Sequence, residues 1–84
     1  VTVFDPDPAA RDRALAFGAE ASGDVAAEDA FDLCFECSGA AAACESSLAA
    51  TRVGATVVWA GAAAPIGCVS VAPERVVRKL ITLR

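Results

Sequence analysis

Histidine is absent from the 84-residue sequence. It is the most common metal ligand among side chains and the usual general acid or base near neutral pH. The four cysteines lie at positions 34, 37, 44 and 68, with only one close pair. Cys34 and Cys37 form C-x-x-C within FDLCFECSG, a strand-like run in which residues three apart point to opposite faces. We therefore expect ordinary buried thiols and no zinc site in this chain.

Basic residues and long hydrophobic runs are also scarce. Lys and Arg number 7 against 11 Asp and Glu, which gives a net charge of −4 and a pI near 4.5. Such a balance argues against nucleic acid, for which a basic face supplies the affinity. The longest apolar runs, such as TVVWAGAAA, fall far short of the about 18 residues of a membrane span. Because the start also lacks a signal-peptide pattern, we expect a cytoplasmic protein with no membrane partner.

Apolar residues make up 56% of the chain and occur in short segments separated by turns. A chain of this length forms one small domain at most. The segments predict strands over 1–4, 19–22, 31–37, 55–61 and 81–84, and helices over 8–17, 40–52 and 73–80. Strands that alternate with helices are typical of a parallel sheet with crossover helices, so the predicted class is α/β.

Local signals mark where these elements begin and end. Asp7 followed by Pro8 is typical of a helix N-cap and first helical position, and Gly18 is placed to end that helix. Gly54 is expected to close the second helix in the same way. The strand over 31–37 shows no clean alternation, which predicts burial on both faces of a parallel sheet.

Ligands of open parallel sheets bind outside the carboxyl ends of the strands. The residues at those predicted ends are Asp5, Ser38, Gly39, Gly61, Ala62 and Arg84. A carboxylate can accept hydrogen bonds from both vicinal hydroxyls of an adenosine ribose, and it repels a 2′-phosphate. Glycines let a flat ring or a carboxamide approach the backbone. Taken singly, Asp5 could be a turn acid and each glycine a strand end, but together they favour a nucleotide.

Three stretches resemble one family. FDLCFECSGAAAACESSLAATRVGATVVWAG resembles the second half of the cofactor domain of medium-chain, zinc-type alcohol dehydrogenases. VFDPDPAARDRALAFGA resembles the family's second strand and helix, and VSVAPERVVRKLITLR resembles the approach to the domain's last strand. DPDP, ECSGA and PERVVRKLITLR are most similar to the branch associated with phosphonate catabolism. The resemblance implies a partial Rossmann-like doubly wound parallel sheet with strands 2–6 of that domain, without its first strand.

The resemblance also implies a set of cofactor contacts, namely Asp5, Cys37, Ser38, Gly61, Ala62, Thr82 and Arg84. Asp5 would hold the adenosine ribose and favour NAD over NADP. Cys37 and Ser38 would line the adenine and ribose side. Gly61 and Ala62 would lie near the nicotinamide, and the last two residues would contact its carboxamide through the backbone.

The chain departs from the family pattern at two positions. Ala10 stands where the family often has a basic residue. The adjacent Arg11 could substitute for it, but as a helix-surface residue it is expected to be solvated. Val53 stands where a second glycine often precedes Gly54.

The G-x-G-x-x-G turn that cradles the pyrophosphate does not occur in the 84 residues, nor do the zinc ligands of a catalytic domain. We therefore expect residues 1–84 to be an incomplete dinucleotide-binding domain that is inactive alone. In the strand order 3-2-1-4-5-6 the first strand is central, so strands 2 and 3 should lack a partner in strands 4–6. The parent is expected to be a homo-oligomer that passes hydride between NAD and a zinc-polarised alcohol or carbonyl.

Two other interpretations stay open. FDLCFECSGA also resembles a strand of S-adenosylmethionine-dependent methyltransferases, another α/β class with an acid after its second strand. The chain could instead be a non-catalytic α/β remnant, whose unpaired sheet edges would favour self-association.

Overall fold

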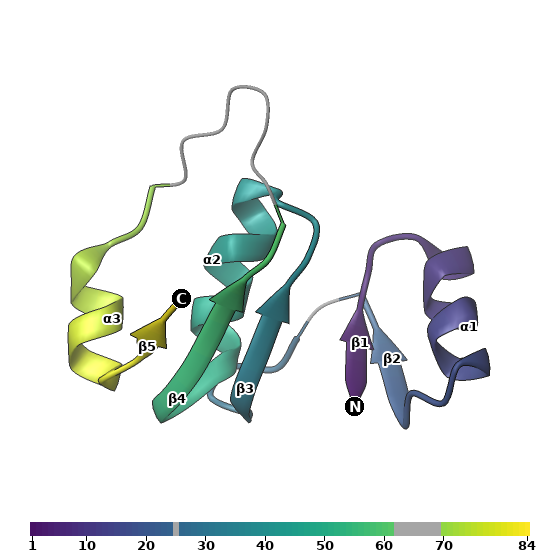
Figure 1. Ribbon diagram of the computed structural model, residues 1–84, viewed down its shortest axis with the longest axis horizontal. Coiled ribbons are helices and arrows are strands. Elements are labelled where there is room, and N and C mark those ends of the chain that lie inside the picture. The colour runs from purple at the N-terminus through teal and green to yellow at the C-terminus, as the bar shows by residue number, and fades with distance from the viewer. Residues whose placement is uncertain (25, 62–69) are drawn as a thin grey trace.

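The structure is a computed structural model that describes residues 1–24, 26–61 and 70–84 (Figure 1). Its elements in chain order are β1 (Thr2–Phe4), α1 (Pro8–Ala16), β2 (Ala21–Gly23), β3 (Phe31–Glu36), α2 (Ala41–Ala50), β4 (Thr51–Trp59), α3 (Pro73–Lys79) and β5 (Thr82–Leu83). Every strand pairing is parallel. The predicted α/β class and the order of elements are confirmed, with a turn and no helix in the described residues between β2 and β3.

The strands form two separate sheets. One contains β1 and β2, and the other has the order β3-β4-β5. In Figure 1, β1 and β3 run in the same direction on either side of the space between the sheets. Phe4 and Phe31 contact each other edge to face with their ring centroids 5.8 Å apart. The expected division of a doubly wound sheet into two unpaired parts is therefore confirmed.

The larger sheet is covered by helices on one face. Helices α2 and α3 pack there, around a core of Leu48, Val57 and Ile81. On the other face Leu33 and Phe35 of β3 are 53% and 63% exposed. The prediction that this strand is buried on both faces was wrong, because the described residues place no helix against that face.

Helix α1 begins and ends as its sequence predicted. The Asp7 carboxylate accepts a hydrogen bond from the Ala9 amide at 3.0 Å, and Pro8 follows as the first helical residue. Gly18 adopts a φ of 103°, a conformation that side chains disfavour, just after the C-cap. None of the helices within the described ranges is long and apolar enough to cross a membrane.

Gly54 lies inside a strand and not at a helix end, which corrects its predicted role. Thr51 is already extended, with φ −85° and ψ 144°, so β4 follows α2 directly. Phe31 of β3 pairs with Thr51, whereas Leu33 pairs with Thr56, so β4 contains extra residues at this point. Gly54 has a φ of 79° in this bulge, where glycine adopts a left-handed backbone without strain.

Candidate functional site

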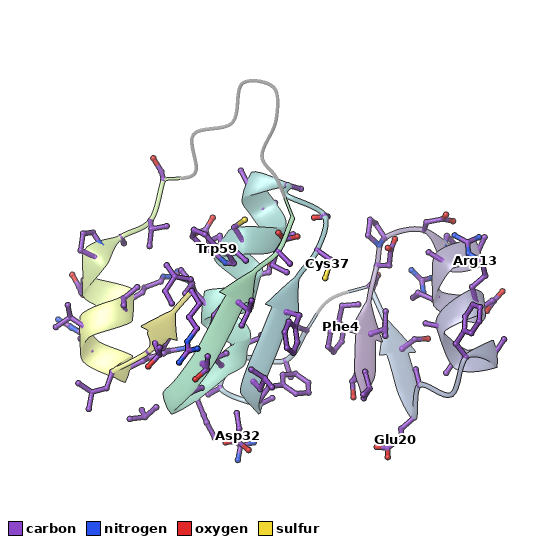
Figure 2. The ribbon with its side chains drawn as sticks, viewed as in Figure 1. Phe4, Arg13, Glu20, Asp32, Cys37 and Trp59 are labelled. Carbon is purple, nitrogen blue, oxygen red and sulfur yellow. The ribbon has the colours of Figure 1, made fainter. Side chains whose placement is uncertain are left out.

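Strands β1, β3 and β4 end on the same side of the molecule (Figure 1). The residues that follow these strands are Asp5, Cys37, Ser38, Gly39, Ala60 and Gly61, and Arg84 follows β5, which is parallel to β4. We call this set of residues the carboxyl edge. In Figure 2, Phe4 and Cys37 lie on the sides of the two sheets that face each other. The predicted site residues at the ends of β3 and β4 therefore share an edge, and Asp5 lies at the end of the neighbouring sheet.

Asp5 is joined to both strands of the small sheet and to the turn that follows. Its amide donates to the Gly23 carbonyl at 3.0 Å, and its Oδ1 accepts from the Asp7 amide at 2.8 Å. The turn-acid interpretation is therefore correct for Oδ1. Among the described residues no protein group donates to Oδ2. A ribose contact through Oδ2 is compatible with the turn role.

Arg11 differs from its expected solvated state. Its Nη1 donates to the Asp5 carbonyl at 2.7 Å, and the residue is half-buried. The first turn of α1 carries residue 11 back over the end of β1, which explains the contact. A guanidinium thus lies beside the end of the strand that Asp5 terminates.

Glu36, the last residue of β3, was missed as a site residue. It is only 5% exposed, and its Oε1 accepts hydrogen bonds from the Ser38 amide at 2.7 Å and from the Ser38 hydroxyl. The Gly39 amide lies 2.9 Å from Oε2, and the Cys44 thiol lies 3.6 Å from the same oxygen. The sequence signal that could have identified it is an acid at the end of a mostly apolar strand, two residues before Ser38-Gly39.

The surroundings of Glu36 favour its charged form. Burial raises the pKa of this carboxyl, but hydrogen bonds from Ser38, Gly39 and Cys44 lower it, and the pKa lies below its ordinary value. Burial also raises the pKa of the Cys44 thiol, and the nearby Glu36 charge raises it further. The carboxylate is therefore the charged member of this cluster and the thiol is a neutral donor.

Gly61 lies against the turn that follows β3. The amides of Ala60 and Gly61 donate to the Glu36 carbonyl at 2.8 Å and 2.9 Å. A Cβ at residue 61 would lie 2.2 Å from the Gly39 nitrogen and 2.7 Å from the Cys37 carbonyl carbon, closer than real Cβ atoms come. Residue 61 must be glycine because the backbone of the turn after β3 lies where a Cβ would be. The expected role of Gly61 in admitting a ligand stays a prediction.

Thr82 lies on β5, beside β4, and Arg84 directly follows that strand. Thr82 pairs with Thr56 of β4. The Arg84 amide donates to the Val57 carbonyl at 2.9 Å, and the Arg84 carbonyl accepts from the Trp59 amide at 2.8 Å. Both residues are exposed, and the Arg84 carbonyl is already hydrogen-bonded within the sheet. Ala62 lies outside the described residues, so the expectation for it stays a prediction.

The cysteines in the described part of the chain are free thiols in different surroundings. Cys44 is buried, Cys34 is half-buried with its pKa raised by burial, and Cys37 is exposed. The expectation of buried thiols is therefore wrong for Cys37, which lies in the exposed turn after β3. Within the described ranges no group of three His, Cys, Asp or Glu residues could hold a metal ion.

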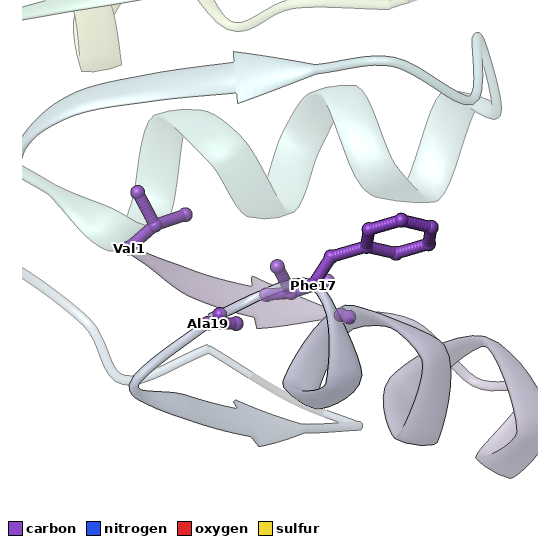
Figure 3. A pocket seen from close by; sticks show the side chains of 6 residues that line it. Val1, Phe17 and Ala19 are labelled. Atoms are coloured by element: carbon purple, nitrogen blue, oxygen red, sulfur yellow. The ribbon is translucent and has the colours of Figure 1, made fainter.

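An apolar hollow of about 270 Å³ lies at the opposite end of β1 (Figure 3). It is lined by Val1, Val3, Ala14, Phe17, Gly18 and Ala19. Phe17 is 91% exposed and Val1 is 85% exposed, so large apolar side chains border it without being covered. Because no polar side chain lines the hollow, it offers no chemistry for a reaction.

No protein-family model and no curated protein matches the chain. A solved structure from Sinorhizobium meliloti 1021, described as a zinc-binding dehydrogenase bound to NADP, matches with a TM-score of 0.86 and 22% identity. The match covers 99% of this chain and 28% of that one, so the chain spans less than a third of that protein's length. At this identity the likeness shows the fold, and the predicted partial Rossmann-like architecture is confirmed.

Proposed function

We propose that residues 1–84 form part of the nicotinamide dinucleotide-binding domain of a longer oxidoreductase of the zinc-type alcohol dehydrogenase kind. The observation that carries this proposal is the carboxyl edge. Asp5 ends β1 in one half of a split parallel sheet, and the turns at Cys37–Gly39 and Gly61 meet at the ends of β3 and β4 in the other half. Nucleotides bind at such strand ends. The fold likeness to an NADP-bound dehydrogenase supports the same class.

The adenosine half of the cofactor is assigned to Asp5, Cys37 and Ser38. The Oδ2 atom of Asp5 would accept hydrogen bonds from the ribose hydroxyls, while Oδ1 holds the turn. Cys37 and Ser38 are exposed at the end of β3 and would line the adenine and ribose side. We propose NAD over NADP as the cofactor, because a carboxylate repels a 2′-phosphate. Arg11 is the one cation contacting the Asp5 backbone in the described residues, and it opposes this preference.

The nicotinamide half is assigned to Gly61, Ala62, Thr82 and Arg84. Gly61 and Ala62 would lie near the ring, and Thr82 and Arg84 would contact its carboxamide through the backbone. The Arg84 carbonyl already accepts from the Trp59 amide, so it would accept a second hydrogen bond there. The nicotinamide, when bound, supplies hydride-transfer chemistry toward a small alcohol or carbonyl. The protein's share of such a reaction is binding, orientation and electrostatics.

The remaining parts of the site are proposed to come from elsewhere in a longer protein. Strands β1 and β3 are each paired on one edge only within the described residues. Leu33 and Phe35 are exposed on the face of β3 that carries no helix in the described residues, and Phe17 is exposed beside the hollow. A strand and helix carrying the pyrophosphate turn would cover this apolar surface. The cysteines described here do not fit a zinc site, so zinc would belong to that other part. The parent is proposed to be a cytoplasmic homo-oligomer.

Binding to the 84-residue chain tests the proposal. We expect NADH added to the ¹⁵N-labelled chain to shift the amide signals of Asp5, Ser38 and Gly61, and NADPH to bind more weakly. Asp5→Asn should remove this difference, because it keeps the turn acceptor and loses the charge. Asp7→Asn is the matched control, since that nearby carboxylate caps α1. No alcohol should be oxidised by the chain alone.

Three results would contradict the proposal. The first is the absence of any shift with either dinucleotide, which favours the non-catalytic remnant. The second is shifts at the same amides with S-adenosylmethionine and not with NADH, which favours the methyltransferase interpretation. The third is an Asp5→Asn chain that keeps the NADH preference, which would remove the ribose assignment.

A further inference from the structure

Glu36 contacts both turns of the carboxyl edge through different parts of the same residue. Its carboxylate accepts hydrogen bonds from the amides of Ser38 and Gly39, at 2.7 Å and 2.9 Å. Its backbone carbonyl accepts from the amides of Ala60 and Gly61, at 2.8 Å and 2.9 Å. The turn after β3 and the turn after β4 are thus held by one residue.

The two turns also touch each other directly. The missing side chain of Gly61 leaves room for Gly39 and Cys37, since a Cβ there would lie 2.2 Å from the Gly39 nitrogen. The turn after β3 therefore cannot move toward β4 unless the turn after β4 moves as well. Glu36 and Gly61 together therefore set the distance between the two turns.

We propose that Glu36 is a positioning residue for the carboxyl edge, which sets the distance between the two turns assigned to the two halves of the dinucleotide. Glu36 is 5% exposed, and protein donors occupy both of its carboxylate oxygens. It therefore acts through Ser38, Gly39 and Gly61 and does not contact the cofactor itself. This role rests on the proposed function only for the identity of the ligand.

The charge of Glu36 matters because no cation faces it in the described residues. Its hydrogen-bond donors are the amides of Ser38 and Gly39, the Ser38 hydroxyl and the Cys44 thiol. Dipoles alone hold the carboxylate, so a neutral side chain of the same shape cannot satisfy all of these donors. In Glu36→Gln the new amide group would meet the Gly39 N–H as donor against donor.

The test compares Glu36→Gln with Asp32→Asn in the 84-residue chain. Asp32 is the matched control because it lies on the same strand, with its side chain 79% exposed and paired to Arg52. In Glu36→Gln the amide signals of Ser38, Gly39 and Gly61 should move. The NADH affinity should fall by about tenfold, or about 1.4 kcal/mol, because the two turns would no longer be held at the spacing that the dinucleotide needs. Asp32→Asn should leave both readouts unchanged.

Gly61→Ala is a second variant that reaches the same turn from the other side. Its Cβ should displace Gly39 and move the Ser38 and Gly39 signals even though Glu36 is intact. The proposal is overturned if Glu36→Gln lowers only the melting temperature and leaves the turn signals and the NADH affinity of the folded chain unchanged. A wild-type chain that binds no NADH overturns the proposed function, and the amide signals of the two variants then decide the role of Glu36.

Discussion

Replacing Lys79 with methionine should destabilise the fold more than an ordinary surface substitution. Lys79 ends α3, and its Nζ donates to the carbonyls of Leu48, Ala49 and Thr51 at 3.2, 3.1 and 3.0 Å. The same ammonium lies 2.7 Å from an Asp29 carboxylate oxygen, and the lysine side chain is only 22% exposed. The Lys79 ammonium therefore binds the carbonyls at the end of α2 and joins this helix end to α3 and to the turn before β3.

The expected loss follows from these contacts. Hydrogen bonds to a charged group contribute about 1.5–3 kcal/mol, and here three carbonyls share one ammonium. A cation at a helix C-terminus adds about 0.3–1 kcal/mol. The ion pair with Asp29 adds little, because that carboxylate is 63% exposed. Methionine keeps the apolar stem in place, so we expect Lys79→Met to lower the free energy of unfolding by about 2–3 kcal/mol.

Urea unfolding followed by the fluorescence of Trp59, the single tryptophan, measures this loss. With a slope of about 1 kcal/mol per molar urea, the midpoint should fall by about 2–3 M. Arg78→Met is the matched control, because within the described ranges Arg78 pairs only with Glu74 and both side chains are largely exposed. It should cost less than about 0.5 kcal/mol. Equal losses in the two variants would refute the assigned role of Lys79.

Three further outcomes are expected. The pKa of Glu36 is lowered in the folded state, so the stability that its charge contributes is complete above the unfolded pKa and is lost as the pH falls through the folded pKa. In Glu36→Gln, the urea midpoint should therefore fall less steeply at acid pH than in the wild-type chain. Leu48→Ala should lower the free energy of unfolding by about 2–5 kcal/mol, because Leu48 is 1% exposed. Phe35→Ala should lower it by less than about 1 kcal/mol, because Phe35 is 63% exposed, and equal losses by calorimetry would contradict the assigned core. Gly54→Ala should lower the free energy of unfolding by about 1–2 kcal/mol. The loss would come from the positive φ alone, since nothing lies within 4 Å of the new Cβ, and unchanged stability would show that the bulge relaxes.

The predictions for the two ends of α1, which depended on neighbours in the sequence, were accurate. Asp7 and Pro8 start α1, and Gly18 follows its end, because capping involves residues only a few positions apart. The division into two sheets also followed from the resemblance, since the strand order of the fold places its first strand between the two groups.

Predictions that depended on packing were less accurate. Periodicity could not tell that Leu33 and Phe35 are exposed, because a run of apolar residues does not state which faces are covered. Gly54 looked like a helix end, and the pairing of β3 with β4 placed it in a bulge.

The sequence by itself determined the α/β class, the order of the elements and the small residues and acid at the strand ends, because these depend on local propensity and spacing. The tertiary structure decided which of these groups meet. The register of β3 against β4 places the Glu36 carbonyl at the amides of Ala60 and Gly61, and the end of α3 places Lys79 on the carbonyls of α2. Such contacts join residues that are distant in the chain, so only the folded backbone could reveal them.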